Sequence, residues 1–389
     1  DDLIPYYEKL ELEIGISGRN DDLVEFFGKC DPLQNPLDRS KKTKILYDRY
    51  LSRKDKLNKK GTFLGTPRIG VSNNDYDVRD KCKYDNLEFW QPNHKSLYSP
   101  SMTLDKLIAE DKLEYKNSIV VDRWEKVNGM IEVVGYHIDT KEEFKFKTKK
   151  LVLAAGTLNT SRIVLKSRKD YKTKLTFFDN PAIQLPIFFP TLIGDTLDID
   201  SFGLIQLNLF YKSEILKKNA IGAVLEITSP MRNDFLDKFP FGIKDNIKFI
   251  KYVLPCMMAC QVFLPSSKEL SAKLSLEENG DIIINSKEDD IPQNLIDEAT
   301  KKLQELGMMT FSNFAIKVSH GNGIHYGGTL PMSKNPTSAY QTTIDGELSQ
   351  DKDIFIVDGS CFGYIPATNY SLSVMANAMR ISKKISAEI

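Results

Sequence analysis

Hydrophobic residues repeat at the helical period in five segments of this chain, and we predict that these segments are helices. They are 1–30, with an end at Gly15 or Gly18; 44–57; 103–111, capped by Ser101 or Thr103; 291–306; and 372–385, with Leu372, Met375, Met379 and Ile385 on one face. Residues 32–100 are otherwise rich in Lys, Asp, Asn and Pro and have weak periodicity. We predict irregular structure there, apart from the helix at 44–57.

Hydrophobic runs of strand length cover the middle of the chain. Three runs, two of them joined by Asn128-Gly129, predict an antiparallel meander. A continuous apolar run then ends at Gly156 and leads into a helix through Leu165, which is typical of a central parallel strand. Later runs, punctuated by Pro and Gly, predict a second and mainly antiparallel sheet. The runs are 118–124, 130–138 and 143–147 for the meander, 151–156 for the central strand, and 175–210, 223–228, 259–264, 272–276 and 282–285 for the second sheet.

These patterns predict a mixed α/β (α+β) fold, and the composition narrows the class of protein. The 389 residues include 53 basic and 53 acidic side chains, so no overall field would attract nucleic acid or an anionic membrane. The longest apolar run, 252–264, is too short to span a bilayer and is predicted to be a core element. Five scattered cysteines favour a reduced, cytoplasmic protein without a disulfide framework. Because the sequence begins with Asp1 and not with Met, we expect its natural start to lie elsewhere.

His325 is the first candidate for chemistry, as one of four histidines and followed closely by Gly327-Gly328. An imidazole with a pKa near 6.5 can accept a proton at neutral pH. The alternative is a buried histidine that is hydrogen-bonded in a turn. His320 could pair with it on a metal, but no third ligand cluster accompanies them, so we predict no metal site. Cys256 and Cys260 have a spacing that favours the interior of a helix.

Three further positions place polar groups at the ends of strands or at the starts of helices. Gly156 would let a ligand approach the backbone at a helix start, although an ordinary strand-to-helix junction explains it equally well. Asp358 follows the apolar strand 354–357 and could bind ligand hydroxyls, or it could cap the next element. Asn369-Tyr370-Ser371 precedes a helix whose N–H groups would stabilise negative charge. The alternative is that Asn369 or Ser371 simply caps that helix.

The order of these features resembles the glucose-methanol-choline family of flavoprotein oxidoreductases. The resemblance rests on Ala154-Ala155-Gly156-Thr157, Thr160-Ser161, Ile163-Val164 and Ser167, on His325-Tyr326-Gly327-Gly328-Thr329, on Asp358-Gly359-Ser360 with Asn369, and on residues 1–18. It implies FAD-dependent oxidation of an alcohol, in which His325 takes the hydroxyl proton, Asn369 binds the same oxygen and the hydride goes to flavin N5. It also implies that Val121, Ala155, Gly156, Asp358, Gly359, Tyr370 and Ser371 contact FAD.

The resemblance further implies two domains and a class of substrate. A Rossmann-like FAD-binding domain would comprise 96–169, with the meander, and 336–389, its N-terminal part being absent. A substrate domain with a mainly antiparallel sheet would comprise 1–95 and 170–335. The polar and aromatic content of the second domain favours a sugar or another polyol, while the electron acceptor and the mode of flavin attachment stay open.

The chain departs from the family in three places. The N-terminal Gly-x-Gly-x-x-Gly loop is absent, Asn369-Tyr370-Ser371 stands where the family usually has Asn-Pro-Thr, and Asp179-Asn180-Pro181 stands where it often has Asp-His-Pro. We expect none of these departures to touch the pair His325 and Asn369. Because both are retained, an FAD enzyme that lacks part of its sequence here is favoured. The alternative is a flavin-free homologue that acts as a binding or scaffold module.

Overall fold

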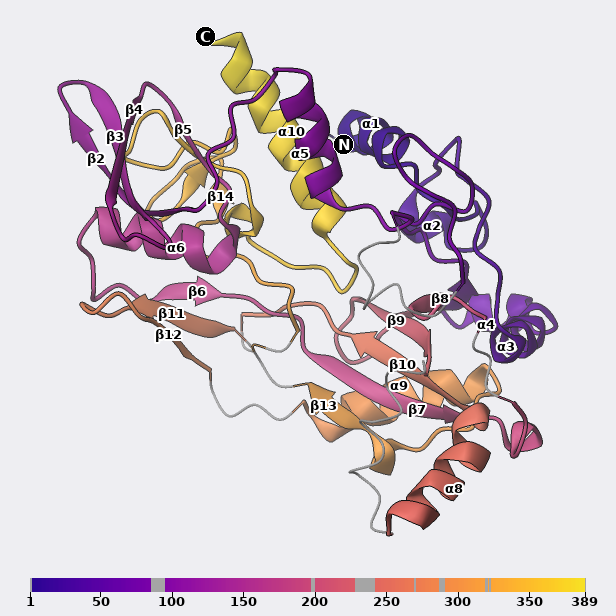
Figure 1. The fold of residues 1–389 in the computed structure, drawn as a ribbon. Helices are drawn as coiled ribbons and strands as arrows, with labels where there is room; N and C mark the ends of the chain where they lie inside the picture. Colours follow the sequence, from indigo (N-terminus) through magenta and orange to yellow (C-terminus); the bar gives the residue numbers. More distant parts are fainter. Residues whose placement is uncertain are drawn as a thin grey trace.

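A computed structural model describes residues 2–84, 95–196, 200–227, 242–268, 271–286, 291–318, 321 and 323–388. Within these ranges the chain forms a mixed α/β molecule, as predicted, with a six-stranded sheet, two three-stranded sheets and two two-stranded pairs. In Figure 1 the large sheet and its helices fill the lower part of the view, and the meander and the two terminal helices fill the upper part. None of the helices in the described ranges is long and apolar enough to cross a membrane.

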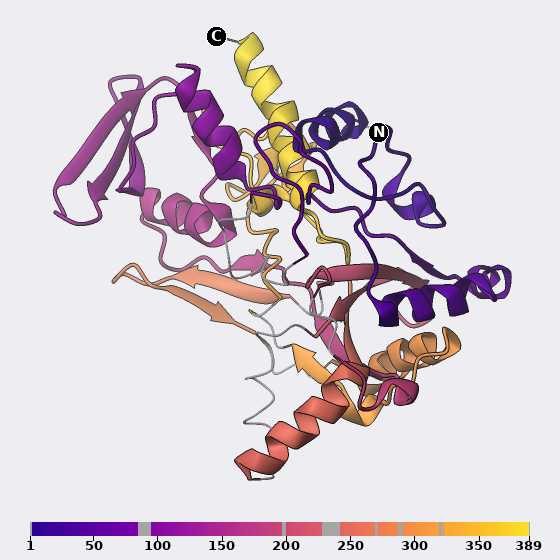
Figure 2. The same cartoon turned by 45° about the vertical axis from the view of Figure 1, so that its right-hand side comes forward.

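Two helices from opposite ends of the chain, α1 (Ile4–Ile14) and α10 (Ser371–Ala387), pack side by side (Figures 1 and 2). α1 confirms the first predicted helix and ends at Gly15, whose φ of 66° suits glycine. In α10, Ala376 has no exposed surface, and its small side chain allows this close approach. The helices are also joined by a hydrogen bond of 2.6 Å from the Tyr7 hydroxyl to the Ser373 hydroxyl.

The apolar residues of α10 form two faces and not the predicted single one. Leu372, Met375 and Met379 join the cluster beneath α1. Ile385 packs instead with Phe355. The prediction was wrong because Ile385 lies roughly 140° around the helix from Leu372.

The predicted meander is confirmed, and a helix packs beside it. The turn Asn128-Gly129 has φ values of 51° and 76°, the left-handed pair that a tight hairpin requires. The elements of this unit are β2 (Ile119–Val127), β3 (Met130–His137), β4 (Glu143–Thr148), β5 (Leu151–Leu153) and α6 (Gly156–Ser167).

β5 was predicted to be a central parallel strand, and the structure confirms that it is parallel but not that it is central. Its partner among the described residues is β16 (Ile354–Ile356), in the register Leu151 with Ile354. Val152 is 45% exposed, so β5 is not buried on both faces. Residues 151–153 were apolar enough for burial, but the described elements cover one side of the strand.

The large sheet has the strand order β1-β8-β9-β10-β7-β13, and every neighbouring pair is antiparallel, as predicted for the second sheet. Its strands are β1 (Thr62–Gly65), β7 (Ala182–Phe188), β8 (Ile205–Lys212), β9 (Asn219–Glu226), β10 (Met257–Phe263) and β13 (Ile316–Val318). β1 falls in the segment that we predicted to be irregular. The runs at 272–276 and 282–285 do not join this sheet but form a separate one with β6 (Leu175–Phe177), as β11 (Ala272–Leu276) and β12 (Ile282–Asn285).

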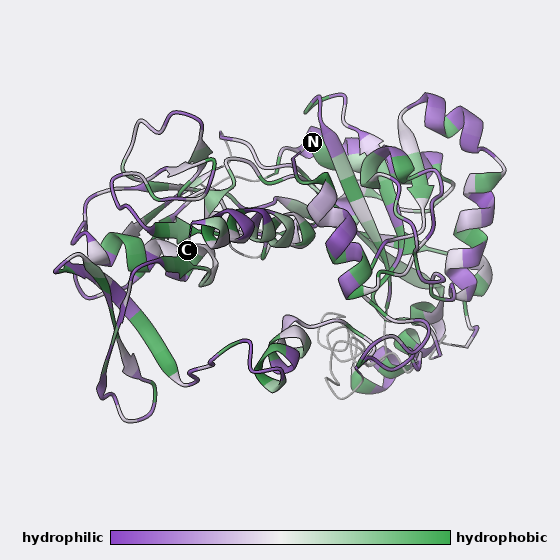
Figure 3. Cartoon of the chain, turned by 90° about the horizontal axis from the view of Figure 1, so that it is seen from above, coloured by the Kyte–Doolittle hydropathy of each residue, from purple (hydrophilic) through white to green (hydrophobic). Residues whose placement is uncertain are grey.

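One face of the large sheet forms the main hydrophobic core, and the other faces the rest of the molecule. Alternate residues such as Leu185, Leu209 and Val262 pack against α3 (Lys41–Leu51) and α9 (Gln293–Glu305). Figure 3 shows hydrophobic residues concentrated along these strands. The opposite face of β7 and β10 is half-buried at every second residue. This alternation leaves a face that can meet the loops of the upper half.

The remaining predicted helices differ from the structure in their bounds, and α8 (Ile243–Val253) was not predicted. The single helix expected at 44–57 is two helices, α3 and α4 (Lys54–Lys59), and the helix expected at 103–111 begins earlier and is capped by Ser99. The apolar run 252–264 is a core element, as predicted, and includes all of β10. The other elements are α2 (Val24–Phe27), α5 (Pro100–Ala109), α8 (Ile243–Val253), β14 (Met332–Ser333), β15 (Thr342–Thr343) and the short 3₁₀ helices η1 (Pro190–Leu192), η2 (Leu254–Cys256), η3 (Ser312–Phe314) and η4 (Gly359–Cys361).

All five cysteines are buried free thiols, in keeping with the predicted absence of a disulfide framework. Cys260 lies in strand β10 and not in a helix, because its spacing from Cys256 spans the junction of η2 and β10. Burial raises the pKa of the Cys260 thiol to about 12. Burial is also the main cause that raises the pKa of Cys361 to about 12, and the nearby carboxylate of Asp358 adds to it. Both thiols therefore stay protonated at neutral pH.

Candidate active site

The loop that carries His325 lies where several distant segments meet. The backbone carbonyl of Tyr326 accepts hydrogen bonds from the Thr157 hydroxyl, at 2.7 Å, and from the Tyr370 hydroxyl. Gly327 exchanges backbone hydrogen bonds with Phe178. The start of α6, the start of α10 and the segment between β6 and β7 are thus joined to the loop around His325.

The backbone of this loop is tightly constrained. The carboxylate of Asp179 accepts hydrogen bonds from the N–H groups of Gly321, at 2.7 Å, and Gly323, at 3.2 Å. A Cβ on Gly328 would lie 2.2 Å from the ring of Phe178, and the φ of Gly328 is 80°. Ile324 has a φ of 55°, which is unusual for a β-branched residue, and directly precedes the histidine. Strained backbone of this kind collects at functional sites.

His325 is 9% exposed, and its Nδ1 lies 3.2 Å from the Oδ1 of Asn180. Burial lowers the pKa of the imidazole below its usual 6.5, and a hydrogen bond with Asn369 and the negative charge of Asp179 offset this only in part. The ring is therefore neutral at pH 7. The structure brings His325 and Asn369 together, but it contradicts our expectation about the departures, because Asn180 and Tyr370 both contact this histidine. Pairing with His320 lies outside the described residues.

The residues at the start of α10 differ in their exposure. Asn369 is exposed, whereas Tyr370 is 8% exposed and its ring meets that of His325 edge-on, with centroids 5.9 Å apart. Burial is the main cause that raises the pKa of Tyr370 to about 12, so its hydroxyl remains a donor. Tyr370 is the N-cap residue, and no side chain caps α10, so the simple capping that we considered for Asn369 or Ser371 is not seen.

Asp358 holds its own neighbourhood in place. Its Oδ1 accepts a hydrogen bond of 2.9 Å from the N–H of Ser360, so it caps η4, which was the alternative role. Its Oδ2 accepts from the Thr160 hydroxyl, which in turn accepts from the N–H of Ala155. A Cβ on Gly359 would lie 2.7 Å from both the Tyr326 carbonyl and the Tyr370 hydroxyl, so glycine is required there.

The predicted cofactor residues on β2 and α6 lie in the same unit but differ in exposure. Ala155 and Gly156 are exposed, and a Cβ on Gly156 would meet no atom within 4 Å. No side chain caps the start of α6. The carbonyl of Val121 already accepts a hydrogen bond of 3.0 Å from Arg162, so a ligand there would have to share it.

The large sheet contributes residues that the sequence did not single out. Phe263 in β10 meets the ring of His325 with centroids 5.4 Å apart. Gln261 lies two residues earlier on the same face and pairs across the sheet with Gln184 in β7. On its other side Gln261 pairs with Ala223 in β9, which in turn pairs with Asn208 in β8. In the described part of the chain, the Oδ1 of Asn208 is buried without a hydrogen-bond partner. Alternating polar residues in strands were the signal that could have found this row.

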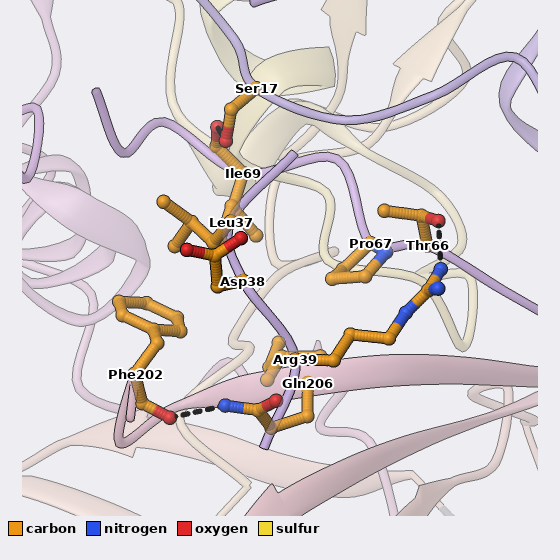
Figure 4. A pocket seen from close by; sticks show the side chains of 10 residues that line it. Ser17, Leu37, Asp38, Arg39, Thr66, Pro67, Ile69, Phe202 and Gln206 are labelled. Carbon is orange, nitrogen blue, oxygen red and sulfur yellow. Dashed lines mark hydrogen bonds between the residues drawn. The ribbon is translucent and has the colours of Figure 1, made fainter. Parts of the chain in front are cut away.

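A separate pocket lies between the N-terminal segment and β8 (Figure 4). There Arg39 donates a hydrogen bond of 2.9 Å to Thr66, and its guanidinium stacks 3.8 Å from the ring centre of Tyr47. None of the residues that line it belongs to the group around His325. Over the described ranges there is also no cluster of three or more His, Cys, Asp or Glu side chains suited to a metal. The candidate chemistry therefore centres on His325.

Comparisons with known proteins find likeness among solved structures but no match by sequence. No protein-family profile and no curated protein matches the chain. Among solved structures, the chain is similar to pyridoxine 4-oxidase from Mesorbium loti, with 13% sequence identity and a TM-score of 0.47 over 69% of this chain and 57% of that chain. The chain thus spans little more than half the length of that protein.

Proposed function

We propose that this protein oxidises an alcohol, in particular a sugar or another polyol, with FAD as its cofactor. The observation that carries the proposal is the environment of His325. Its imidazole is buried and neutral at pH 7, it is held by Asn180, and Asn369 stands beside it. A neutral, oriented imidazole with an amide next to it is suited to remove the proton of a hydroxyl group.

The residues around this histidine fit an anionic cofactor. α6 and α10 both begin without a side-chain cap, so backbone N–H groups in their first turns are available to negative groups. The open space next to Gly156 would admit a ligand close to the first of these helices. When bound, FAD would supply the hydride acceptor. The residues that would hold it are Val121, Ala155, Gly156, Asp358, Gly359, Tyr370 and Ser371.

Each residue of the pair then has a distinct task. His325 would accept the hydroxyl proton, and burial supports this because it keeps the ring unprotonated. Asn369 would donate a hydrogen bond to the same oxygen and so orient it. Tyr370 would hold the start of α10 against the histidine loop through its bond to the Tyr326 carbonyl.

The face of the large sheet supports a neutral, hydroxyl-rich substrate. Phe263 provides an apolar surface beside His325, and the amides of Asn208, Gln184 and Gln261 lie in one row of the same face. Amides both donate and accept hydrogen bonds, as hydroxyl groups do, and they carry no charge. We expect Gln261→Leu to raise KM for a polyol more than it lowers kcat.

The test uses protein made from the full reading frame and saturated with FAD. We expect flavin absorbance in the purified protein and its bleaching by a sugar or polyol without oxygen. His325→Ala should retain the flavin but lose the bleaching, whereas His137→Ala, at the end of strand β3 of the meander, should behave as wild type. Bleaching that survives in His325→Ala would refute the assignment of the base. A folded protein that takes up no FAD would refute the enzyme and favour the binding or scaffold module.

A further inference from the structure

We propose that Asn180 is a positioning residue that fixes the tautomer of His325, with the proton on Nδ1 and the lone pair on Nε2. The proposal concerns the histidine itself and deepens the proposed function, on which its consequence for catalysis rests. It is carried by one geometric fact: the amide of Asn180 can present only its oxygen to the imidazole.

The orientation of the Asn180 amide is set by two backbone carbonyls. Its Nδ2 donates to the carbonyl of Leu264 at 2.9 Å and to the carbonyl of Pro366 at 3.0 Å. A flipped amide would turn its oxygen toward both carbonyl oxygens and lose both hydrogen bonds. The side chain is 1% exposed, so water cannot replace them. Asn180 therefore keeps Oδ1 toward His325.

The histidine must then supply the proton between the two side chains. An amide oxygen can only accept a hydrogen bond, and Nδ1 of His325 lies 3.2 Å from it. Nδ1 therefore carries the hydrogen. Because burial also keeps the ring neutral, Nε2 is left with a lone pair. This is the nitrogen that can remove a proton from a substrate.

The other groups that face the ring do not supply an acceptor that is fixed in this way. Asn369 also hydrogen-bonds the imidazole, but it is exposed, and its amide can present either its oxygen or its NH2 group to the ring. Tyr370 meets the imidazole with its ring, edge-on, and its hydroxyl donates to the Tyr326 carbonyl. Asp179 acts on the imidazole through its charge. Its Oδ2 accepts hydrogen bonds from the N–H groups of Gly321 and Gly323, and its Oδ1 accepts from the N–H of Asn180. Phe263 offers only a ring. The locked amide is thus the group that selects the tautomer.

The direct test is nitrogen NMR of protein labelled with ¹⁵N at histidine, without added cofactor. With four histidines in the chain, the His325 signals are identified by their loss in His325→Gln. In the wild type at neutral pH we expect an N–H signal from Nδ1 and a lone-pair signal from Nε2. Asn180→Leu should abolish that preference, because it removes the acceptor. Asn180→Asp should restore it, because a carboxylate also accepts, and should raise the pKa of the imidazole.

A merely structural role for Asn180 would give a different result. An N–H signal on Nε2 in the wild type, or an unchanged tautomer in Asn180→Leu, would overturn the proposal. If Asn180→Leu does not fold, the wild-type spectrum still shows which nitrogen of His325 carries the proton. The spectrum of Asn180→Asp, taken above the raised pKa of His325, then shows whether another acceptor at this position keeps the proton on Nδ1. In the FAD-loaded enzyme we expect kcat to fall by about tenfold or more in Asn180→Leu. It should recover in Asn180→Asp at a pH above the raised pKa of His325. The spectra need no flavin. They therefore test the tautomer of His325 even if the proposed function is wrong.

Discussion

The buried ion pair between Lys42 and Glu226 provides the sharpest test of how the large sheet is held to its helices. Lys42 lies in the first turn of α3, and Glu226 is the last residue of β9. Their Nζ and Oε2 atoms are 2.8 Å apart, and the two side chains are only 4% and 2% exposed. The Ser40 hydroxyl, which caps α3, donates to the same carboxylate.

The burial of this ion pair sets how much we expect Lys42→Met to lower the free energy of unfolding. An exposed pair is worth at most about 1 kcal/mol, whereas removing one partner of a buried pair costs about 3–5 kcal/mol. At 2–4% exposure the second case applies, since the substitution leaves a buried carboxylate without its cation. We therefore expect Lys42→Met to lower the free energy of unfolding by about 4 kcal/mol. The double substitution Lys42→Met with Glu226→Leu should regain most of that loss, because no charge is then buried.

The assay is equilibrium unfolding in urea, followed by circular dichroism and by tryptophan fluorescence to confirm that the two transitions coincide. Lys41→Met is the matched control, since Lys41 is the neighbouring residue and its side chain is 62% exposed in its pair with Asp195. The control should stay close to the wild type. A Lys42→Met protein within about 1 kcal/mol of wild type, or a double variant no more stable than the single one, would refute the reasoning.

Four further predictions concern the candidate site. The kcat/KM of the FAD-loaded enzyme should fall on the acid side with a midpoint below 6.5, because burial lowers the pKa of His325; a midpoint above 6.5 would contradict this assignment. For the same reason the unfolded chain takes up this proton at a higher pH than the folded protein, so stability should decline as the pH falls below about 6.5. Gly328→Ala should cost about 1–3 kcal/mol in urea unfolding, since its Cβ would lie 2.2 Å from the ring of Phe178, whereas Gly129→Ala, at a similar φ but in open space, should cost less. Tyr370→Phe should cost about 1 kcal/mol, because it removes one of two donors to a backbone carbonyl; an equally stable variant would show that this hydrogen bond contributes nothing.

The parts of the fold that the sequence predicts well are those with local signals. The meander follows from three strand-length runs and the Asn128-Gly129 turn, and α1 follows from a helical repeat that ends at Gly15. β1 was missed because it has only four residues and its pairing depends on β8, far along the chain. Cys260 was placed in a helix because its spacing from Cys256 was considered without the alternation of β10 around it.

The candidate site was accessible to sequence reasoning in outline but not in its contacts. The order of His325, Asp358 and Asn369 is visible along the chain, and the structure brings the first and last of them together. The contact between Asn180 and His325 joins positions 145 residues apart, so no local pattern in the sequence predicts it. The domain boundaries at 96–169 with 336–389, and at 1–95 with 170–335, stay predictions, as do the cytoplasmic location and the roles of the cofactor residues.

The reactivity of two buried thiols can show which parts of the protein unfold locally. Cys260 lies inside the core of the large sheet, whereas Cys361 lies in η4 next to the carboxylate of Asp358. Since both stay protonated and shielded, an alkylating reagent can reach each one only when the structure around it opens. Equal labelling rates for the two thiols would mean that the large sheet and the segment around η4 open as one cooperative unit. A faster rate at Cys361 would mean that the segment around η4 opens while the sheet stays closed.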